Sequence, residues 1–180
     1  KIPDGVGVRL AARLRGLRLE SMSGIDIAEE LLSVAASKGY RVFFLGAKRG
    51  VAEKAAENMH VRYPTLQICG VHHGYFDKSG AENAAVLKKI RTAAPDILFV
   101  CFGFPAQEKW ITDNLASLPS VKLAMGLGGS LDVWSGNIRR APLLVQKAGL
   151  EWLWRTVLEP KRARIFVDIP RFLIKALTDK

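Results

Sequence analysis

The chain has 180 residues, of which 49% are hydrophobic, so it can fold as one globular domain with a full core and is not a disordered protein. Its formal net charge of +10 comes from its ends: residues 1–19 hold five basic residues and one acidic residue, and residues 138–180 hold ten and four. This distribution favours a localised anionic partner, such as a phosphate group, a lipid surface or a nucleic acid, although a solvated basic face is the commoner cause of such runs.

The sequence carries no sign of export or of a membrane span. No secretory signal is recognisable, and no apolar run approaches the roughly 18 residues that a span requires. Cys69 and Cys101 each end an apolar run, which is typical of buried strand thiols rather than of a disulfide or a metal pair. We therefore expect a cytoplasmic protein.

The first eight residues are typical of the exit of a strand, so we expect a further segment upstream of them. Asp4 lies between Pro3 and Gly5, and this tight turn presents its carboxylate ahead of a predicted helix over residues 8–14. From these residues alone, an aspartate that merely shapes the turn is the simpler interpretation.

From residue 23 onward the pattern alternates regularly between strands and helices. Ser23 and Asp26 fit a capping box at the start of a helix that ends near Gly39. Further strands are predicted over residues 41–45, 66–70, 97–102 and 121–125, and further helices over 50–63 and 81–94 and from residue 106. Short connections throughout predict an α/β fold, a Rossmann-like parallel sheet with helices on both faces.

Glycine-containing turns follow several of these strands. The turn at residues 46–50 could bind phosphate at a helix N-terminus, but it lacks the ending of a P-loop. The turns at residues 103–105 and 126–129 should lie at the carboxyl edge of the sheet, where open α/β sheets bind ligands. Gly128 and Gly129 would let the backbone approach a pyrophosphate closely.

Three polar or aromatic residues near these turns are candidate ligand contacts. Gln107 could bond a base or sugar, or be an ordinary solvent-facing helix residue. Asp132 could accept hydrogen bonds from a ribose, or only stabilise the first turn of a helix. Tyr75 lies in a loop with Phe76, and such rings either stack on a flat ligand or close the core.

The histidines give little indication of a metal site. His72 and His73 are adjacent, so in an extended chain they point to opposite sides, and the only other histidine is His60. We therefore expect no metal site.

The composition changes after residue 137, which divides the chain into an α/β domain over residues 1–137 and a basic, aromatic-rich helical appendage over residues 138–180. Tryptophan, phenylalanine and leucine interleaved with arginine and lysine are what an interfacial helix uses, because its rings sit at headgroup depth while its cations meet lipid phosphates. An arm packed on its own sheet or on a neighbouring subunit is the alternative.

Eight short motifs, taken in order, resemble the WecG/TagA/CpsF glycosyltransferases over nearly the whole chain. They are Pro3-Asp4-Gly5-Val6-Gly7, Ser23-Gly24-Ile25-Asp26, Phe44-Leu45-Gly46, His73-Gly74-Tyr75-Phe76, Gly103-Phe104-Pro105-Ala106-Gln107-Glu108-Lys109-Trp110, Gly126-Leu127-Gly128-Gly129-Ser130-Leu131-Asp132, Arg140-Ala141-Pro142 and Gly149-Leu150-Glu151-Trp152-Leu153-Trp154-Arg155. Each motif is weak alone, but eight of them at the family's spacing make a specific signal.

The resemblance implies an inverting transfer of an N-acetylmannosamine-type sugar from UDP to a polyprenyl-diphosphate-linked N-acetylglucosamine, in the synthesis of wall teichoic acid or a related surface polymer. No metal and no cofactor are implied. Asp4 matches the family's proposed general base. Tyr75, Gln107 and Asp132 match donor-pocket residues, and Arg155 and Arg162 of the appendage would offset the diphosphate charge.

The resemblance also implies where the protein acts. The appendage would dock on the inner face of the cell membrane as a peripheral attachment, nucleic acid is not an implied partner, and a homo-oligomer is compatible with the pattern. One departure is Ser21, which follows Glu20 where the family commonly has an arginine, so this position cannot supply a cation to a diphosphate.

Two other functions remain as alternatives. An NAD(P)-dependent oxidoreductase is disfavoured because residues 126–131 form an incomplete dinucleotide fingerprint, ending in Leu131, and do not open the first strand-helix unit. A non-catalytic basic module that binds membrane or nucleic acid would use the same charged tail without any catalytic chemistry.

Overall fold

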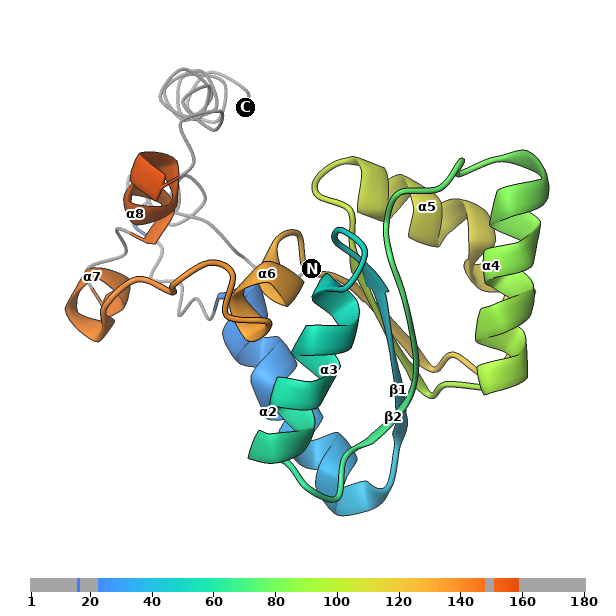
Figure 1. Cartoon of the computed structure of the whole chain (residues 1–180), viewed down its shortest axis with the longest axis horizontal. Helices are drawn as coiled ribbons and strands as arrows, with labels where there is room; N and C mark the ends of the chain where they lie inside the picture. Colours follow the sequence, from blue (N-terminus) through green and yellow to red (C-terminus); the bar gives the residue numbers. More distant parts are fainter. Residues whose placement is uncertain (1–15, 17–22, 148–150, 159–180) are drawn as a thin grey trace. The chain divides into compact units, whose positions relative to one another are not determined.

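The computed structural model describes residue 16 and residues 23–147 and 151–158 (Figure 1). The chain divides into two units, residues 27–139 and the remainder, and each is considered by itself. The described elements are α2 (Gly24–Lys38), β1 (Arg41–Gly46), α3 (Val51–Arg62), β2 (Gln67–His72), α4 (Gly80–Ala93), β3 (Ile97–Cys101), α5 (Ala106–Asn114), the 3₁₀ turn η1 (Leu115–Ser117), β4 (Leu123–Gly126), α6 (Ser130–Trp134), α7 (Leu143–Lys147) and α8 (Glu151–Leu158). The helix predicted over residues 8–14 lies outside the described residues.

The four strands form one parallel sheet in the order β2-β1-β3-β4. Val42 of β1 lies opposite Ile97 of β3, which in turn lies opposite Leu123 of β4. The chain runs outward from β1 to β2, crosses back to β3, and runs outward again to β4. The winding therefore reverses between β1 and β3, and ligands of such sheets bind outside the carboxyl ends of the strands at this point.

The predicted α/β class, a Rossmann-like parallel sheet, is confirmed, with several strand boundaries corrected. β2 runs to His72 rather than ending at residue 70, and β3 ends at Cys101 rather than at residue 102. The last strand was predicted from Val121, but β4 begins at Leu123. The N–H of Val121 instead donates to the carbonyl oxygen of Leu118 at 3.0 Å, which closes a turn before the strand.

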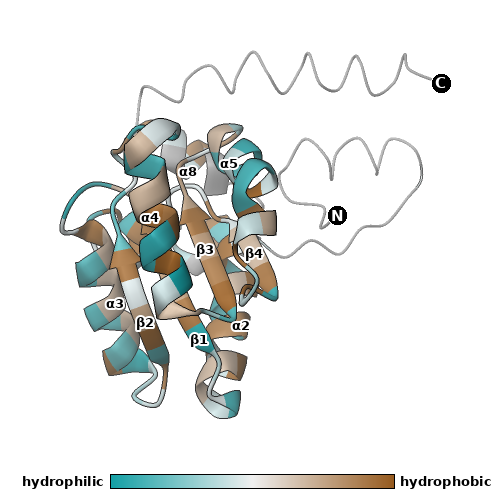
Figure 2. Cartoon of the chain, turned by 90° about the vertical axis from the view of Figure 1, so that its right-hand side faces the viewer, coloured by the Kyte–Doolittle hydropathy of each residue, from teal (hydrophilic) through white to brown (hydrophobic). Residues whose placement is uncertain are grey.

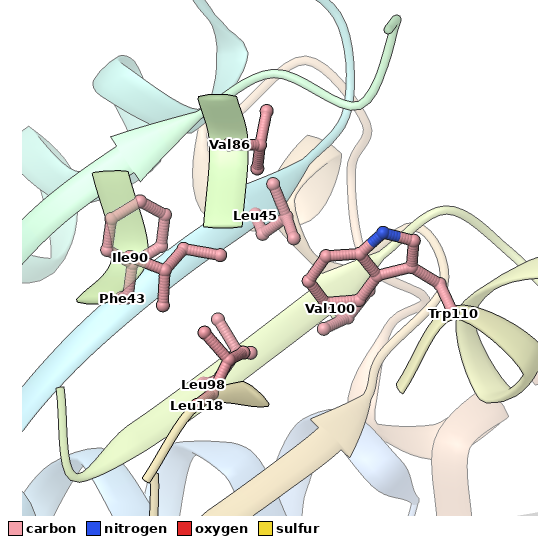
Figure 3. Packing of buried hydrophobic residues seen from close by; sticks show 8 residues of the cluster. All are labelled: Phe43, Leu45, Val86, Ile90, Leu98, Val100, Trp110 and Leu118. Carbon is pink, nitrogen blue, oxygen red and sulfur yellow. The ribbon is translucent and has the colours of Figure 1, made fainter. Parts of the chain in front are cut away.

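Helices cover both faces of the sheet, with α2, α3 and α6 on one face and α4 and α5 on the other (Figure 1). Alternate strand residues point to opposite faces, so Phe43 and Leu45 enter one core while Phe44 enters the other. The core beside α4 and α5 consists of buried apolar side chains (Figure 3): Phe43, Leu45, Val86, Ile90, Leu98, Val100, Trp110 and Leu118. Figure 2 shows hydrophobic strands beside helices, α3 and α4, that carry hydrophilic residues.

The second core fixes the position of the short helix α6. The rings of Phe44, Phe99 and Trp134 lie within 5.5 to 6.1 Å of one another. The indole N–H of Trp134 donates to Glu29 Oε1 at 3.2 Å, and Asn58 Nδ2 donates to the Trp134 carbonyl oxygen at 2.8 Å. Helix α6, which follows the loop after β4, is thereby anchored to α2 and α3.

In the other unit, the described residues include an ion pair between distant parts of the sequence. Arg140 Nη2 lies 2.6 Å from Asp26 Oδ1 and donates to Ser23 Oγ at 3.2 Å. Ser23 Oγ also accepts the N–H of Asp26 at 3.4 Å, so the predicted capping pair is present at the start of α2. Within the described part of the chain, no helix has the length and apolar character needed to cross a membrane.

Candidate functional site

The loops after β1, β2, β3 and β4 are tied together at the carboxyl edge of the sheet. The N–H of Ala47 donates to Cys101 O at 3.2 Å, the N–H of Gly74 to Ala47 O at 2.8 Å, and the N–H of Leu127 to Val100 O at 2.9 Å. The first two bonds join the loop after β1 to the end of β3 and to the loop after β2, and the third joins the loop after β4 to β3. The glycine-containing turns therefore lie at the carboxyl edge of the sheet, as predicted.

Gly46 permits the closest of these approaches. A Cβ on Gly46 would lie 2.4 Å from the carbonyl oxygen of Cys101, and the residue has a φ of 145°, which side-chain-bearing residues rarely adopt. Because any side chain there would collide with backbone, glycine is what allows the ends of β1 and β3 to meet.

Gln107 fastens the loop after β3 to the loop after β4. Its Oε1 accepts the N–H of Gly103 at 3.2 Å and the N–H of Gly128 at 2.8 Å, and its Nε2 donates to Glu108 Oε1 at 2.8 Å. Only 5% of the residue is exposed, so the interpretation of Gln107 as an ordinary solvent-facing residue is wrong. A Cβ on Gly126 would lie 2.6 Å from Gln107 Nε2, so this glycine makes room for the amide.

The glycines after β4 have separate structural roles. Gly128 has a φ of 54°, and a Cβ there would meet no atom within 4 Å, so its space is open although its N–H is engaged by Gln107. Gly129 directly precedes α6. Their expected approach to a pyrophosphate stays a prediction.

Asp132 lies in the first turn of α6, close to the end of β3. Its carbonyl oxygen accepts the N–H of Ile138 and the hydroxyl of Ser135, each at 3.0 Å. Burial raises the pKa of the neighbouring Cys101 thiol to about 12, and the charge of Asp132 adds to that rise. Asp132 thus lies near the end of β3, and its predicted contact with a ribose stays a prediction.

The two aromatic residues of the loop after β2 are separated by the structure. Phe76 packs edge-on against Phe102 at 5.8 Å between ring centroids and borders the core beside α4 and α5. Tyr75 is 68% exposed, and its N–H donates to His73 Nδ1 at 3.2 Å. Phe76 thus closes the core, while Tyr75 is available to a ligand.

Sequence reasoning missed two further residues on the loops at this edge of the sheet. Phe104, on the loop after β3, is 84% exposed, an unusual position for a phenylalanine. Lys78 is half-buried and bonds to the backbone of the loop that carries Tyr75. An aromatic inside the glycine-proline turn was a usable signal for Phe104, whereas the role of Lys78 depends on contacts that no local pattern encodes.

The histidines of this edge are engaged with the backbone. His72 Nδ1 lies 2.8 Å from the carbonyl oxygen of His73. Burial lowers the pKa of His73, and the nearby charges of His72 and Arg49 lower it further. Among the residues that the structure describes, no cluster of three or more histidine, cysteine, aspartate or glutamate side chains could hold a metal ion.

Three predicted site residues belong to the other unit. Asp4 and Arg162 lie outside the described residues. Arg155 lies within α8. The structure thus gathers Tyr75, Gln107, Gly128, Gly129 and Asp132 on the loops and first helical turns at one edge of the sheet. Their contacts with a ligand, and the roles predicted for Asp4, Arg155 and Arg162, stay predictions.

The fold defines an α/β protein whose glycine-containing loops gather at the carboxyl edge of its parallel sheet. Comparison with known proteins identifies the family within this fold class: residues 1–180 match the model of the glycosyl transferase WecG/TagA/CpsF family. The chain belongs to this family. No finding supports the oxidoreductase or the non-catalytic alternative.

Curated relatives give the activity names found in this family. The chain is 38% identical, over 180 residues, to the N-acetylglucosaminyldiphosphoundecaprenol N-acetyl-beta-D-mannosaminyltransferase of Bacillus subtilis strain 168, covering 99% of this chain and 68% of the relative. It is 38% identical, over 175 residues, to the enzyme of the same name from Staphylococcus aureus strain MRSA252, covering 97% of this chain and 67% of the relative. The chain therefore spans about two thirds of the length of these relatives.

Proposed function

We propose that the chain transfers an N-acetylmannosamine-type sugar from UDP to a polyprenyl-diphosphate-linked N-acetylglucosamine, in the synthesis of wall teichoic acid or a related surface polymer. The observation that carries the proposal is the 38% identity, along almost the whole chain, to relatives named for mannosaminyl transfer to N-acetylglucosaminyldiphosphoundecaprenol. The parallel sheet with its ligand-binding loops at one edge supports a nucleotide-linked donor.

In the proposed mechanism the acceptor hydroxyl attacks the anomeric carbon, and UDP leaves from the opposite face with inversion. The hydroxyl must lose its proton as it attacks, and Asp4 is the proposed acceptor of that proton. The departing diphosphate gains negative charge, which Arg155 and Arg162 are proposed to offset. These cations would serve in place of a metal.

The donor is proposed to bind at the described edge of the sheet. Tyr75 offers an exposed ring for stacking on the uracil, and Asp132 offers a carboxylate for the ribose hydroxyls. Gln107 contributes by holding the two flanking loops in register, since its Oε1 is bonded to both of them. Gly128, where a Cβ would meet no atom within 4 Å, leaves open space for the diphosphate next to Gly129.

The basic appendage is proposed to dock the enzyme on the inner face of the cell membrane, where a polyprenyl acceptor resides. The printed sequence supports this with ten basic residues interleaved with aromatic residues over residues 138–180. Binding to vesicles that contain anionic lipid should then be lost when residues 138–180 are removed, and it should weaken with added salt.

The activity is tested by incubating the protein with UDP-N-acetylmannosamine and a lipid-diphosphate N-acetylglucosamine acceptor. We expect acceptor-dependent UDP release both with EDTA and with added divalent metal. Absence of release under both conditions would overturn the proposed function, and release only with metal would overturn its metal independence.

Asp4→Asn tests the assignment of the base. We expect turnover to be abolished while UDP binding, measured by calorimetry, is kept, because the amide cannot accept the proton but preserves the shape of the side chain. Asp113→Asn is the matched control, since this aspartate is exposed on α5 and pairs with Lys109 in a surface ion pair of 2.9 Å. Equal loss of turnover and UDP binding in Asp4→Asn would make Asp4 a structural residue.

A further inference from the structure

The loop of residues 73–79, which joins β2 to α4, carries the exposed Tyr75 and is anchored at both ends. At its start the N–H of Gly74 donates to Ala47 O at 2.8 Å. At its end the N–H of Asp77 donates to Glu82 Oε2 at 2.6 Å, and Asp77 Oδ1 accepts the N–H of Ser79 at 3.0 Å. Between these anchors the N–H of Tyr75 donates to His73 Nδ1 at 3.2 Å, but neither anchor engages the carbonyl groups on the two sides of Tyr75.

Lys78 bonds to the backbone on both sides of Tyr75. Its Nζ donates to the carbonyl oxygen of Gly74 at 2.5 Å and to that of Phe76 at 2.8 Å. These two carbonyls flank Tyr75, so one ammonium group bridges the residue before it and the residue after it. Bonds from a charged donor are stronger than neutral ones, and two of them to one short segment restrict its backbone.

The ammonium group of Lys78 also lies over two aromatic rings. Its Nζ is 3.8 Å from the ring centroid of Phe76 and 4.5 Å from that of Phe102. Phe102 in turn packs edge-on against the buried Trp110 at 5.8 Å between centroids. The cation is therefore held between the loop and the side-chain core beside α4 and α5, which gives the loop a rigid support.

This arrangement decides between two roles for the lysine. A lysine that binds a diphosphate directly turns its ammonium group towards the ligand, but here two of the three N–H donors are used by carbonyls and the charge lies over two rings. The lysine therefore acts through the segment that it holds rather than on a ligand.

We propose that Lys78 is a positioning residue that holds the backbone of Tyr75 so that its ring is pre-arranged to contact the nucleotide of the donor. This inference rests on the proposed function, since it takes Tyr75 as a contact of the UDP donor. A binding group that is held in its bound conformation loses less conformational freedom on binding. If that restraint is removed, the affinity falls in proportion to the fraction of molecules that still have the binding-competent conformation.

The test compares Lys78→Met with Lys88→Met in the whole chain. Methionine keeps most of the apolar stem and removes the ammonium, and Lys88 is exposed on α4, so the control makes the same substitution without touching the loop. We expect Lys78→Met to weaken UDP binding about tenfold, which is the effect if roughly one molecule in ten keeps the binding-competent loop conformation. It should also raise KM for the UDP-sugar while kcat stays within about twofold of the wild-type value. Lys88→Met should match the wild type in both.

The same pair of substitutions is then made in a Tyr75→Ala background. If Lys78 acts through Tyr75, Lys78→Met should change UDP affinity by less than about twofold once the ring is absent. A tenfold loss in both backgrounds, or no loss in either, would overturn the inference.

Hydrogen exchange separates this inference from the proposed function. We expect the amides of residues 73–79 to exchange faster in Lys78→Met than in the wild type or in Lys88→Met, while the strands keep their protection. If the wild type binds no UDP, the proposed function fails and the assigned ligand contact fails with it, whereas unchanged exchange alongside intact UDP binding overturns the role of Lys78 alone.

Discussion

Replacing Gln107 with methionine should loosen the edge of the sheet where the ligand is expected. The substitution nearly preserves side-chain volume but removes the Oε1 that accepts the N–H groups of Gly103 and Gly128. Because methionine fills the same space, the cavity contribution to the free energy of unfolding should be small. The change therefore isolates the two hydrogen bonds.

The expected magnitude follows from these bonds. Each hydrogen bond of this kind contributes about 1 kcal/mol net, so losing both should lower the free energy of unfolding by about 2 kcal/mol. For a chain of this size that corresponds to a fall in Tm of about 4–8 °C. The residue is 5% exposed, so water cannot fully replace the lost acceptor.

Urea unfolding followed by circular dichroism measures this loss, with Glu108→Ala as the control. Glu108 accepts a bond from Gln107 Nε2 but is exposed, so its removal should cost less than about 0.5 kcal/mol. A Gln107→Met variant as stable as the wild type would refute the conclusion that Gln107 stabilises the fold by linking the two loops. Equal destabilisation by Glu108→Ala would refute it as well, since the effect would then come from the Nε2 side.

Two other perturbations test the same edge and the opposite one. Gly46→Ala should lower the melting temperature more than Gly50→Ala. A Cβ at Gly46 would lie 2.4 Å from a backbone atom, whereas a Cβ at Gly50 would meet no atom within 4 Å, so that substitution carries only the left-handed backbone penalty of about 1 kcal/mol. Similar losses in the two variants would contradict this prediction. The backbone N–H of Arg41, with the charge of Lys122, holds the pKa of Asp96 below its usual range. That carboxylate therefore adds stability that is lost as the pH falls through its lowered pKa, so Asp96→Asn should flatten the pH dependence of the urea midpoint between about pH 5 and about pH 2; an unchanged slope would contradict it.

The layers of the fold were predictable because the apolar pattern of each strand and the short connections between elements indicate the same architecture. In β1 every residue after Arg41 is buried, which matches an uninterrupted apolar run. The short connections left few ways to arrange the strands other than as a parallel sheet covered on both faces. The exact start of β4 was not predictable, because Val121 ends the turn that contains Pro119 and yet, as an apolar β-branched residue, resembles the first residue of the strand.

The contacts within the site were harder to predict. Helix α5 buries Gln107, Trp110 and Asn114, so its inner face carries two amides beside one indole. The spacing of these residues predicts that they share one face of the helix, but the polarity of the two amides alone would predict that they are exposed to solvent. That Gln107 would bond Gly128, 21 positions away, depends on how two loops meet in space. The bridge made by Lys78 is likewise invisible to periodicity.

The ion pair between Arg140 and Asp26 has a consequence for how such a chain can be rearranged. Residues 27–139 lie between these two partners, so the chain passes into that unit and out of it at points joined by a 2.6 Å contact. A segment whose two ends meet can be lengthened, exchanged or circularly permuted without redirecting the chain on either side. Residues 27–139 can therefore be treated as an exchangeable unit whose two ends are held together by the ion pair between Arg140 and Asp26.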